Sequence, residues 1–312
     1  MAAKFRRSTR GNTVVVADSS GVRFAHAEPK IGARPLISSY GETSAGDGQE
    51  GLAAALKSLG VAGVRNGMTL LPPQDYQFVA VDAPEVPEAE LKSAMKWRLK
   101  DIIGYPIEEA TFDLLPIPVP AAAASRARSI FSVVAKSQLL QRRVQDFDYA
   151  RFGLAVIDIP ETAQRNVAAL FEEEGRGVAW LYFDESGGLM TISYNGELYH
   201  ARRFDITAAT IEAASGAVRD DLFNRILLEL QRTIDNFERQ FSSIALTRVL
   251  VGPEREDSGL AEFLRSNLAI GVESVSLESV VDFAPGTLPG REAQWRFFHL
   301  FGCALRSADA SQ

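Results

Sequence analysis

The chain has 312 residues and a mass of 34.0 kDa, with 46% hydrophobic and 23% charged residues. These values exclude a disordered or fibrous protein and favour two domains or one large bilobed domain. The formal net charge of −7 argues against a dedicated nucleic-acid-binding protein, whose binding face is normally basic. No run approaches the ~18 apolar residues that span a bilayer, and no apolar signal core follows the basic N-terminus. The sequence therefore predicts a cytoplasmic protein with no transmembrane segment of its own.

The first half is predicted to alternate short strands with helices. Strands are expected at residues 14–17, 22–27, 35–39, 69–71, 76–81, 129–135 and 154–159, and helices at 50–59, 88–103 and 137–149. In the helix at 88–103, four apolar residues recur at i+3 or i+4 and predict one stripe facing a core. They are Leu91, Met95, Leu99 and Ile102. Trp97 lies about 160–200° from Met95 and Leu99, so its large side chain is expected off that stripe.

The second half follows the same order of strands, a hairpin and then helices. Strands are expected at residues 178–183, 189–194, 197–204, 248–251 and 272–275, and helices at 161–174, 219–241, 258–268 and 292–305. The long helix carries an unbroken apolar stripe of Leu222, Ile226, Leu230, Ile234, Phe237 and Phe241. Asn195-Gly196 predicts a tight hairpin turn. The shared order of elements indicates a duplicated α/β domain.

The two halves also share an Asp-x-Ser-Gly turn after their first strand, at residues 18–21 and 184–187. Two such hairpins facing a cleft could hold a nucleotide, through backbone N–H groups on phosphate and an Asp on hydrated Mg²⁺. Asp, Ser and Gly are also common turn residues, with Asp accepting a local hydrogen bond. From the residues alone, the second interpretation is favoured.

Other catalytic and metal-binding motifs are missing from the sequence. There is no phosphate-binding P-loop, dinucleotide fingerprint, nucleophile elbow, Cys-x-x-Cys pair or zinc-protease motif. The three histidines, His26, His200 and His299, have no metal-ligand spacing and are expected to be structural. Cys303 lies on the apolar face of the last helix and is expected to be a buried, inert thiol. The sequence thus predicts no metal site and no catalytic residue.

Four stretches make the chain resemble the actin-like pilus-assembly proteins of the PilM type, specifically the MshI branch that serves mannose-sensitive haemagglutinin (MSHA) pili. They are VVVADSSGVRFAHAE, VPEAELKSAMKWRLKDIIGYPIEEATFDLLPIP, AWLYFDESGGLMTISYNGELYHARRFDI and FFHLFGCALR. The resemblance covers most of the chain. It implies an α/β, actin-like (ribonuclease H-like) duplicated two-lobe fold with an inserted small subdomain.

The resemblance also implies a domain division. Residues 1–157 would form the first lobe, with the insert at about 68–136, and the C-terminal helix 292–306 would close it. Residues 158–291 would form the second lobe.

The same resemblance assigns nucleotide-binding positions, but the residues there depart from the family pattern. The assigned positions are Asp18, Ser19, Ser20, Gly21, Asp184, Ser186, Gly187, Gly188 and Gly252. In the first loop, Val16 falls on the metal-site Asp and Asp18 falls on a glycine. In the second loop, Ser186 replaces a glycine. At the adenosine side, Pro253 follows Gly252 and supplies no N–H. We therefore expect weak or absent binding of ATP with Mg²⁺, and no enzymatic activity.

The favoured function is a cytosolic, non-catalytic adaptor in type IV (MSHA-type) pilus biogenesis. By resemblance, its partner is a PilN-like bitopic inner-membrane protein of the pilus assembly platform, whose cytoplasmic N-terminal peptide would dock beside the insert. Trp97, Tyr105 and Pro106 are the candidate partner-binding residues, and replacing Trp97 or Tyr105 with Ala is expected to weaken capture. The alternative is an active ATPase or sugar kinase of the same fold.

The membrane would be reached through that partner. The basic N-terminal residues Lys4, Arg6, Arg7 and Arg10 are expected to give only weak, salt-sensitive binding to anionic vesicles.

Overall fold

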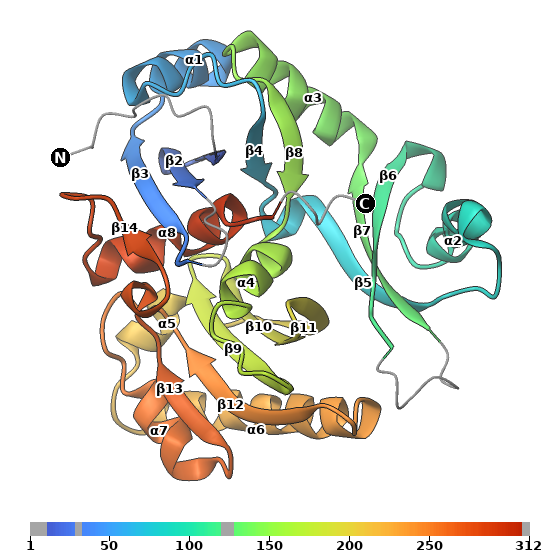
Figure 1. Cartoon of the computed structure of the whole chain (residues 1–312), viewed down its shortest axis with the longest axis vertical. Coiled ribbons are helices and arrows are strands. Elements are labelled where there is room, and N and C mark those ends of the chain that lie inside the picture. The colour runs from blue at the N-terminus through green and yellow to red at the C-terminus, as the bar shows by residue number, and fades with distance from the viewer. Residues whose placement is uncertain (1–10, 29–32, 120–127, 308–312) are drawn as a thin grey trace.

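The computed structural model describes residues 11–28, 33–119 and 128–307, and its strands form three sheets (Figure 1). The basic N-terminal cluster at residues 4–10 lies outside the described residues. The first sheet has six strands in the order β14-β3-β2-β1-β4-β8. Their bounds are β1 (Asn12–Asp18), β2 (Gly21–Glu28), β3 (Leu36–Thr43), β4 (Gly67–Leu70), β8 (Leu154–Asp158) and β14 (Asp282–Phe283).

The second sheet has five strands in the order β11-β10-β9-β12-β13. Their bounds are β9 (Arg176–Asp184), β10 (Gly187–Tyr194), β11 (Glu197–Phe204), β12 (Ala245–Val251) and β13 (Gly271–Ser274). Each of the two sheets thus begins with three antiparallel strands, β1–β2–β3 or β9–β10–β11, followed by strands that pair in parallel. This repeated order is the duplication that the sequence predicts.

The third sheet is small and antiparallel, with strands β5 (Tyr76–Asp82), β6 (Ala110–Pro116) and β7 (Ser129–Lys136) in the order β5-β7-β6. It stands with α2 (Glu88–Lys100) at the right-hand side of Figure 1, beside the two larger sheets. These elements fall within the insert predicted at about 68–136. The lobe boundaries stay a prediction, and β14 pairs with β3 of the first sheet although it lies within 158–291.

Helices cover both large sheets. The first sheet carries α1 (Gly48–Leu59) and α3 (Ser137–Tyr149), and the second carries α5 (Ala208–Ala213), α6 (Gly216–Gln240) and α7 (Leu260–Asn267). The predicted apolar stripe of α6 is buried along its whole length. Gly60 ends α1 in the left-handed conformation, with φ 79°, as its C-terminal glycine predicts.

The last helix, α8 (Arg291–Ala304), joins the two large sheets. Its residues pack on β1 and β2 from one side and on the rings of Trp180 and Tyr182 from the other. It also crosses α4 (Pro160–Ala168) closely at Gly302, where a Cβ atom would lie 2.2 Å from the carbonyl oxygen of Ala163. The FGCALR segment therefore needs glycine at this position. Because α8 also packs on β1 and β2, residues near both ends of the chain meet in one core.

The structure differs from the predicted elements in several places, and the short elements α5 and β14 were not predicted at all. Strand β6 was not predicted because prolines surround it, yet it lies at a sheet edge, where proline is tolerated. Helix α4 ends at Ala168, six residues before the predicted end. Helix α2 ends at Lys100 in a turn that exposes 45% of Ile102 and buries Ile103, so the placement of Ile102 on the core stripe is wrong.

Candidate functional site

The two Asp-x-Ser-Gly turns have the same geometry. In each hairpin the Asp pairs with the Gly three residues later, Asp18 with Gly21 and Asp184 with Gly187. The backbone N–H of Ser20 donates to Oδ1 of Asp18 at 2.8 Å, and that of Ser186 donates to Oδ1 of Asp184 at 2.7 Å. The two glycines have φ values of 129° and 131°, which favour glycine. Each turn is therefore closed by its own Asp, as the favoured interpretation predicts.

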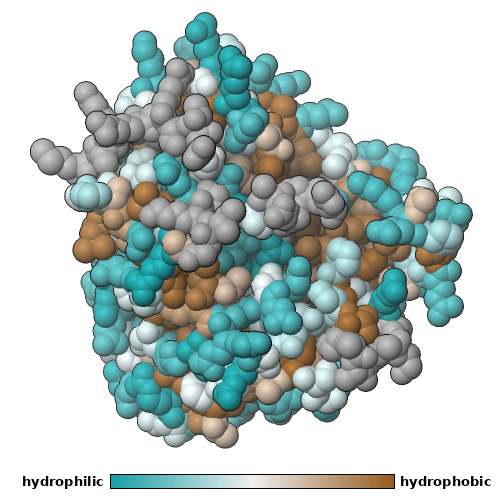
Figure 2. Space-filling view, viewed as in Figure 1, coloured by the Kyte–Doolittle hydropathy of each residue, from teal (hydrophilic) through white to brown (hydrophobic). Residues whose placement is uncertain are grey.

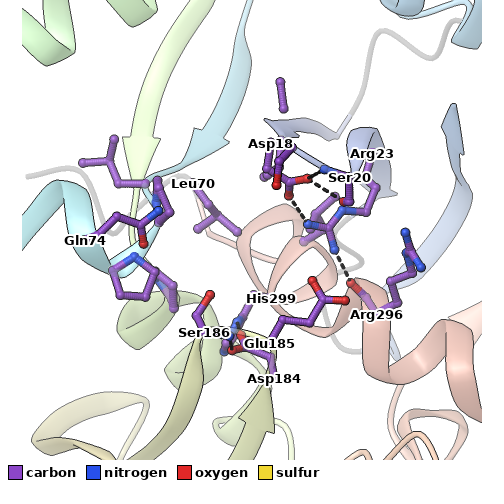
Figure 3. Close-up of a pocket in the computed structure, with 18 of the residues that line it drawn as sticks. Asp18, Ser20, Arg23, Leu70, Gln74, Asp184, Glu185, Ser186, Arg296 and His299 are labelled. Atoms are coloured by element: carbon purple, nitrogen blue, oxygen red, sulfur yellow. Dashed lines mark hydrogen bonds and ion pairs between the residues drawn. The ribbon is translucent and has the colours of Figure 1, made fainter. Parts of the chain in front are cut away.

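Both turns line one cleft of about 320 Å³ between the two large sheets (Figure 3). Of the nine predicted nucleotide positions, the cleft brings together Asp18, Ser19, Ser20, Asp184 and Ser186. The predicted glycines 21, 187 and 188 lie beside it and are not among its lining residues. Gly252 lines a separate, much smaller cavity at the end of β12.

The carboxylate of Asp18 is already paired with Arg23 of β2. The Arg23 guanidinium forms an ion pair with Oδ2 of Asp18 and donates to the backbone carbonyl of Arg296 at 3.1 Å (Figure 3). Burial alone would raise the pKa of Asp18, but the Ser20 hydroxyl and the Arg23 charge outweigh it and lower the pKa. Asp18 is thus an ionised carboxylate whose charge is already balanced by the Arg23 guanidinium.

Asp184 has a different environment. Burial is the main influence on this carboxyl group and raises its pKa, although the Ser186 N–H works in the opposite direction. Nδ1 of His299, on α8, lies 3.8 Å from Oδ2 of Asp184. Burial, with the charges of Arg203 and Arg23, lowers the pKa of His299 to about 3, so the imidazole is neutral at pH 7. His299 therefore contributes a neutral dipole, and no positive charge, beside Asp184.

The backbone N–H and carbonyl of Gly252 likewise form hydrogen bonds within the chain. The indole N–H of Trp180 donates to the Gly252 carbonyl at 2.5 Å, and the backbone N–H of Gly252 donates to Leu181. The Ser258 hydroxyl donates to the Glu254 carboxylate at 2.6 Å, while burial raises the pKa of Glu254. An acidic side chain and a proline thus occupy the place where the resemblance puts an adenosine-side glycine turn.

Sequence reasoning did not single out the charged residues that complete the cleft. Arg23, Arg143, Glu185 and Arg296 all line it. The three arginines each pair with an acid of the chain: Arg23 with Asp18, Arg143 with Asp75 at 3.0 Å, and Arg296 with Glu42 at 2.7 Å. The short spacing of Asp18 and Arg23 within one hairpin could have indicated their ion pair from the sequence. The pair of Glu42 and Arg296 could not be predicted in this way, because the two residues lie far apart along the chain.

The other expected structural residues are buried or, in the case of His200, half-buried. Nδ1 of His26 lies 2.9 Å from the Thr13 hydroxyl, burial lowers the pKa of His200, and Cys303 is fully buried in α8. Within residues 11–28, 33–119 and 128–307, no group of three His, Cys, Asp or Glu side chains could hold a metal ion. Over the same ranges, no helix is long and apolar enough to cross a bilayer.

The candidate partner-binding residues lie on α2 and in the turn that follows it. Tyr105 is half-buried against the local core of Leu99, Ile103 and Ile107, and Nζ of Lys136 lies 5.3 Å from the centre of its ring. Pro106 next to it is exposed. Trp97 projects from the opposite side of the helix, with 72% of the residue exposed. The structure therefore keeps Tyr105 and Pro106 together and places Trp97 apart from them.

Comparisons with known proteins address the fold. No protein-family profile and no curated protein matches the chain. Among solved structures, the chain is similar to one described as "PilM-PilN type IV pilus biogenesis complex", with 17% identity, a TM-score of 0.69, and coverage of 96% of this chain and 98% of that chain. This full-length likeness confirms the predicted actin-like α/β fold.

Two further similarities are more distant. One is to the cytoplasmic domain of EpsL, an inner-membrane component of the type II secretion system of Vibrio cholerae, at 12% identity, TM-score 0.49, and coverage of 96% and 97% of the two chains. The other is to a Bacteroides thetaiotaomicron protein with an actin-like ATPase fold and unknown function, at 9% identity, TM-score 0.48, and coverage of 88% and 93%.

Proposed function

We propose that the chain is a non-catalytic adaptor of a type IV pilus assembly machine of the MSHA type. In this role it docks the cytoplasmic N-terminal peptide of a PilN-like inner-membrane protein. The observation that carries the proposal is the full-length similarity, inserted sheet included, to a structure described as a PilM–PilN complex. The MshI-like sequence segments support the narrower assignment to MSHA pili. The chain would then work at the cytoplasmic face of the membrane, held there by its partner.

The proposed lack of catalysis rests on the cleft. A nucleotide phosphate would need free N–H groups at the two turns, and Mg²⁺ would need a free carboxylate. Here the N–H groups of Ser20 and Ser186 donate to the Asp residues of their own turns, and Arg23 pairs with Asp18. Binding a nucleotide would therefore require these internal contacts to break first. The alternative function, an active ATPase or sugar kinase, needs such a rearrangement.

We expect no micromolar binding of ATP with Mg²⁺ by isothermal titration calorimetry, and no hydrolysis above the buffer rate. Phosphate would have to displace the contacts of Asp18 and Asp184, each of which belongs to a closed turn. Micromolar binding that Asp184→Ala abolishes, and that the control Asp205→Ala outside the cleft leaves intact, would contradict the proposal. That result would favour the ATPase or kinase.

Tyr105 and Pro106 supply the test of peptide docking. An aromatic ring that is half-buried beside an exposed proline offers apolar contact to a peptide, and aromatic residues dominate binding energy at many interfaces. We expect Tyr105→Ala to weaken binding of a synthetic PilN-like N-terminal peptide about tenfold or more. The exposed Tyr149, on α3, provides the matched control as Tyr149→Ala. Melting temperatures are measured in parallel. Unchanged affinity in a well-folded Tyr105 variant would place the peptide elsewhere.

A further inference from the structure

Trp97 is an unusual surface residue in this chain. It is 72% exposed, whereas the other two tryptophans, Trp180 and Trp295, are buried at 0% and 3%. Met95 and Leu99 of α2 are buried, so Trp97 lies on the outward side of this helix. The helix itself stands at the outer edge of the inserted sheet (Figure 1). A large aromatic side chain held this far from any core is a feature of interaction surfaces.

Cations surround this tryptophan. Lys96, Arg98 and Lys100 are all exposed, and Nζ of Lys100 lies 5.7 Å from the centre of the Trp97 ring. At about 100° per residue, Lys96 and Arg98 flank Trp97 on either side, and Lys100 lies one turn further along. We call these four residues the Trp97 face. Hydrophilic side chains predominate over this edge of the molecule (Figure 2).

The acidic residues of α2 lie at the two ends of the helix. Glu88 and Glu90 lie in the first turn of the helix, where they favourably face the helix dipole. Asp101 follows the last helical residue, four positions after Trp97, so it lies beside the Trp97 face and offsets one of its three cations. Lys92 leans over the Phe112 ring at the flank of the helix. The C-terminal half of α2 is therefore basic, in a chain whose net charge is −7.

We infer that the Trp97 face rests on an anionic lipid surface. Tryptophan favours the headgroup level of a bilayer, and lysine and arginine can lay their aliphatic stems on apolar material while their charges meet lipid phosphate. Charge complementarity thus selects an anionic surface. A peptide is less well matched, because Trp97 projects alone from a convex helix among exposed cations and lines neither the cleft nor the cavity at Gly252.

This contact is weak on its own, because it has one aromatic residue and three cations. At physiological salt the attraction is screened beyond about 8 Å. It becomes effective when a membrane protein already holds the chain at the bilayer, since the second contact is then intramolecular. The inference goes beyond the proposed function, and only the strength of the contact beside the membrane rests on the partner that the proposed function supplies. It assigns a lipid-facing side to the molecule and moves Trp97 from peptide docking to membrane contact.

The intrinsic fluorescence of the full chain tests this directly, because Trp97 is the one exposed tryptophan of three. On addition of vesicles rich in phosphatidylglycerol, we expect a blue shift of the emission and protection from acrylamide quenching. Phosphatidylcholine vesicles, or about 0.5 M NaCl with the anionic vesicles, should abolish both effects. Full quenching of Trp97 in the presence of anionic vesicles would overturn the inference. So would protection that a PilN-like peptide produces and vesicles do not, since Trp97 would then be a peptide contact.

Vesicle flotation of variants distinguishes binding through the Trp97 face from non-specific attraction by any exposed positive charge. Lys96→Gln with Lys100→Gln should lower partitioning onto anionic vesicles about 10–30-fold, and Trp97→Ala about tenfold. The matched control is Arg142→Gln with Arg225→Gln, which removes the same charge from exposed positions on α3 and α6. An equal loss in the control, or wild-type partitioning of the Trp97 and lysine variants, would overturn the inference in favour of non-specific charge or the N-terminal basic residues.

Discussion

Replacing Glu161 with alanine is expected to lower the free energy of unfolding by about 3 kcal/mol. Glu161, on α4, is 1% exposed, and its carboxylate accepts hydrogen bonds from the Tyr76 hydroxyl and from Nε of Arg203 at 3.0 Å. Burial, with the Glu161 charge second, raises the pKa of Tyr76 well above 10, so the phenol stays protonated as the donor. Removing the carboxylate leaves a buried hydroxyl without its acceptor and Arg203 without its counterion.

The expected loss lies at the lower end of the range for broken buried ion pairs, because Arg203 is one-third exposed and can gain water. Urea unfolding of the full chain measures it. The matched control is Glu229→Ala on α6, which breaks the more exposed ion pairs of Glu229 with Arg202 and Arg232 and should cost less than about 1 kcal/mol. Equal losses in the two variants would show that the Tyr76–Glu161–Arg203 cluster contributes no more than a surface pair.

This cluster also joins distant parts of the chain. Tyr76 belongs to β5 of the inserted sheet, Glu161 to α4, and Arg203 to the edge strand β11 of the second sheet. A partner peptide that docks beside the insert would therefore meet a subdomain whose position is fixed by a buried polar contact. The Glu161 variant should consequently loosen the insert against the second sheet as well as lower stability.

The second large effect concerns pH. The folded pKa of His299 is about 3, below its ordinary value of 6.5, so between these values the unfolded state binds the proton and the folded state does not. The folded state therefore suffers no penalty from a neutral His299 above pH 6.5, and the free energy of unfolding falls as the pH decreases below that value. Between pH 6.5 and about pH 4, His299 should remove about 3 kcal/mol from the free energy of unfolding.

The variant His299→Gln tests whether His299 causes this loss of stability at low pH. Glutamine stays neutral and can still face Gln164, whose Oε1 atom lies 3.4 Å from Nε2 of His299. We expect the variant to lose less stability than wild type between pH 6.5 and about pH 4, as measured by urea unfolding at several pH values. Because Asp18 and Asp184 are present in both proteins, their own titration largely cancels in the comparison. Parallel pH profiles for wild type and variant would contradict the assigned protonation state.

The sequence predicted those features that depend on neighbouring residues. The apolar stripe of α6 repeats every three or four residues, and the Asp-x-Ser-Gly turns are closed by contacts within four residues, so local patterns were enough. Strand β6 was missed because prolines at a sheet edge imitate a loop. The exposure of Ile102 was missed because helical periodicity does not indicate where a helix stops.

The electrostatics of the cleft could not be predicted in the same way. His299 reaches Asp184 from a helix more than a hundred positions away along the chain, and Arg296 pairs with Glu42 from the opposite end. Such pairs depend on how α8 lies between the two large sheets, which no local pattern encodes. The separation of Trp97 from Tyr105 is a third example, because it follows from which side of α2 meets the inserted sheet.

Titrating a PilN-like N-terminal peptide into the full chain by calorimetry, with and without ATP and Mg²⁺, tests the proposed adaptor function most directly. The adaptor function predicts that the peptide binds, and the closed turns at Asp18 and Asp184 with the pairing of Arg23 predict the same affinity under both conditions. Peptide binding that appears only with ATP and Mg²⁺, or no peptide binding in either condition, would contradict it.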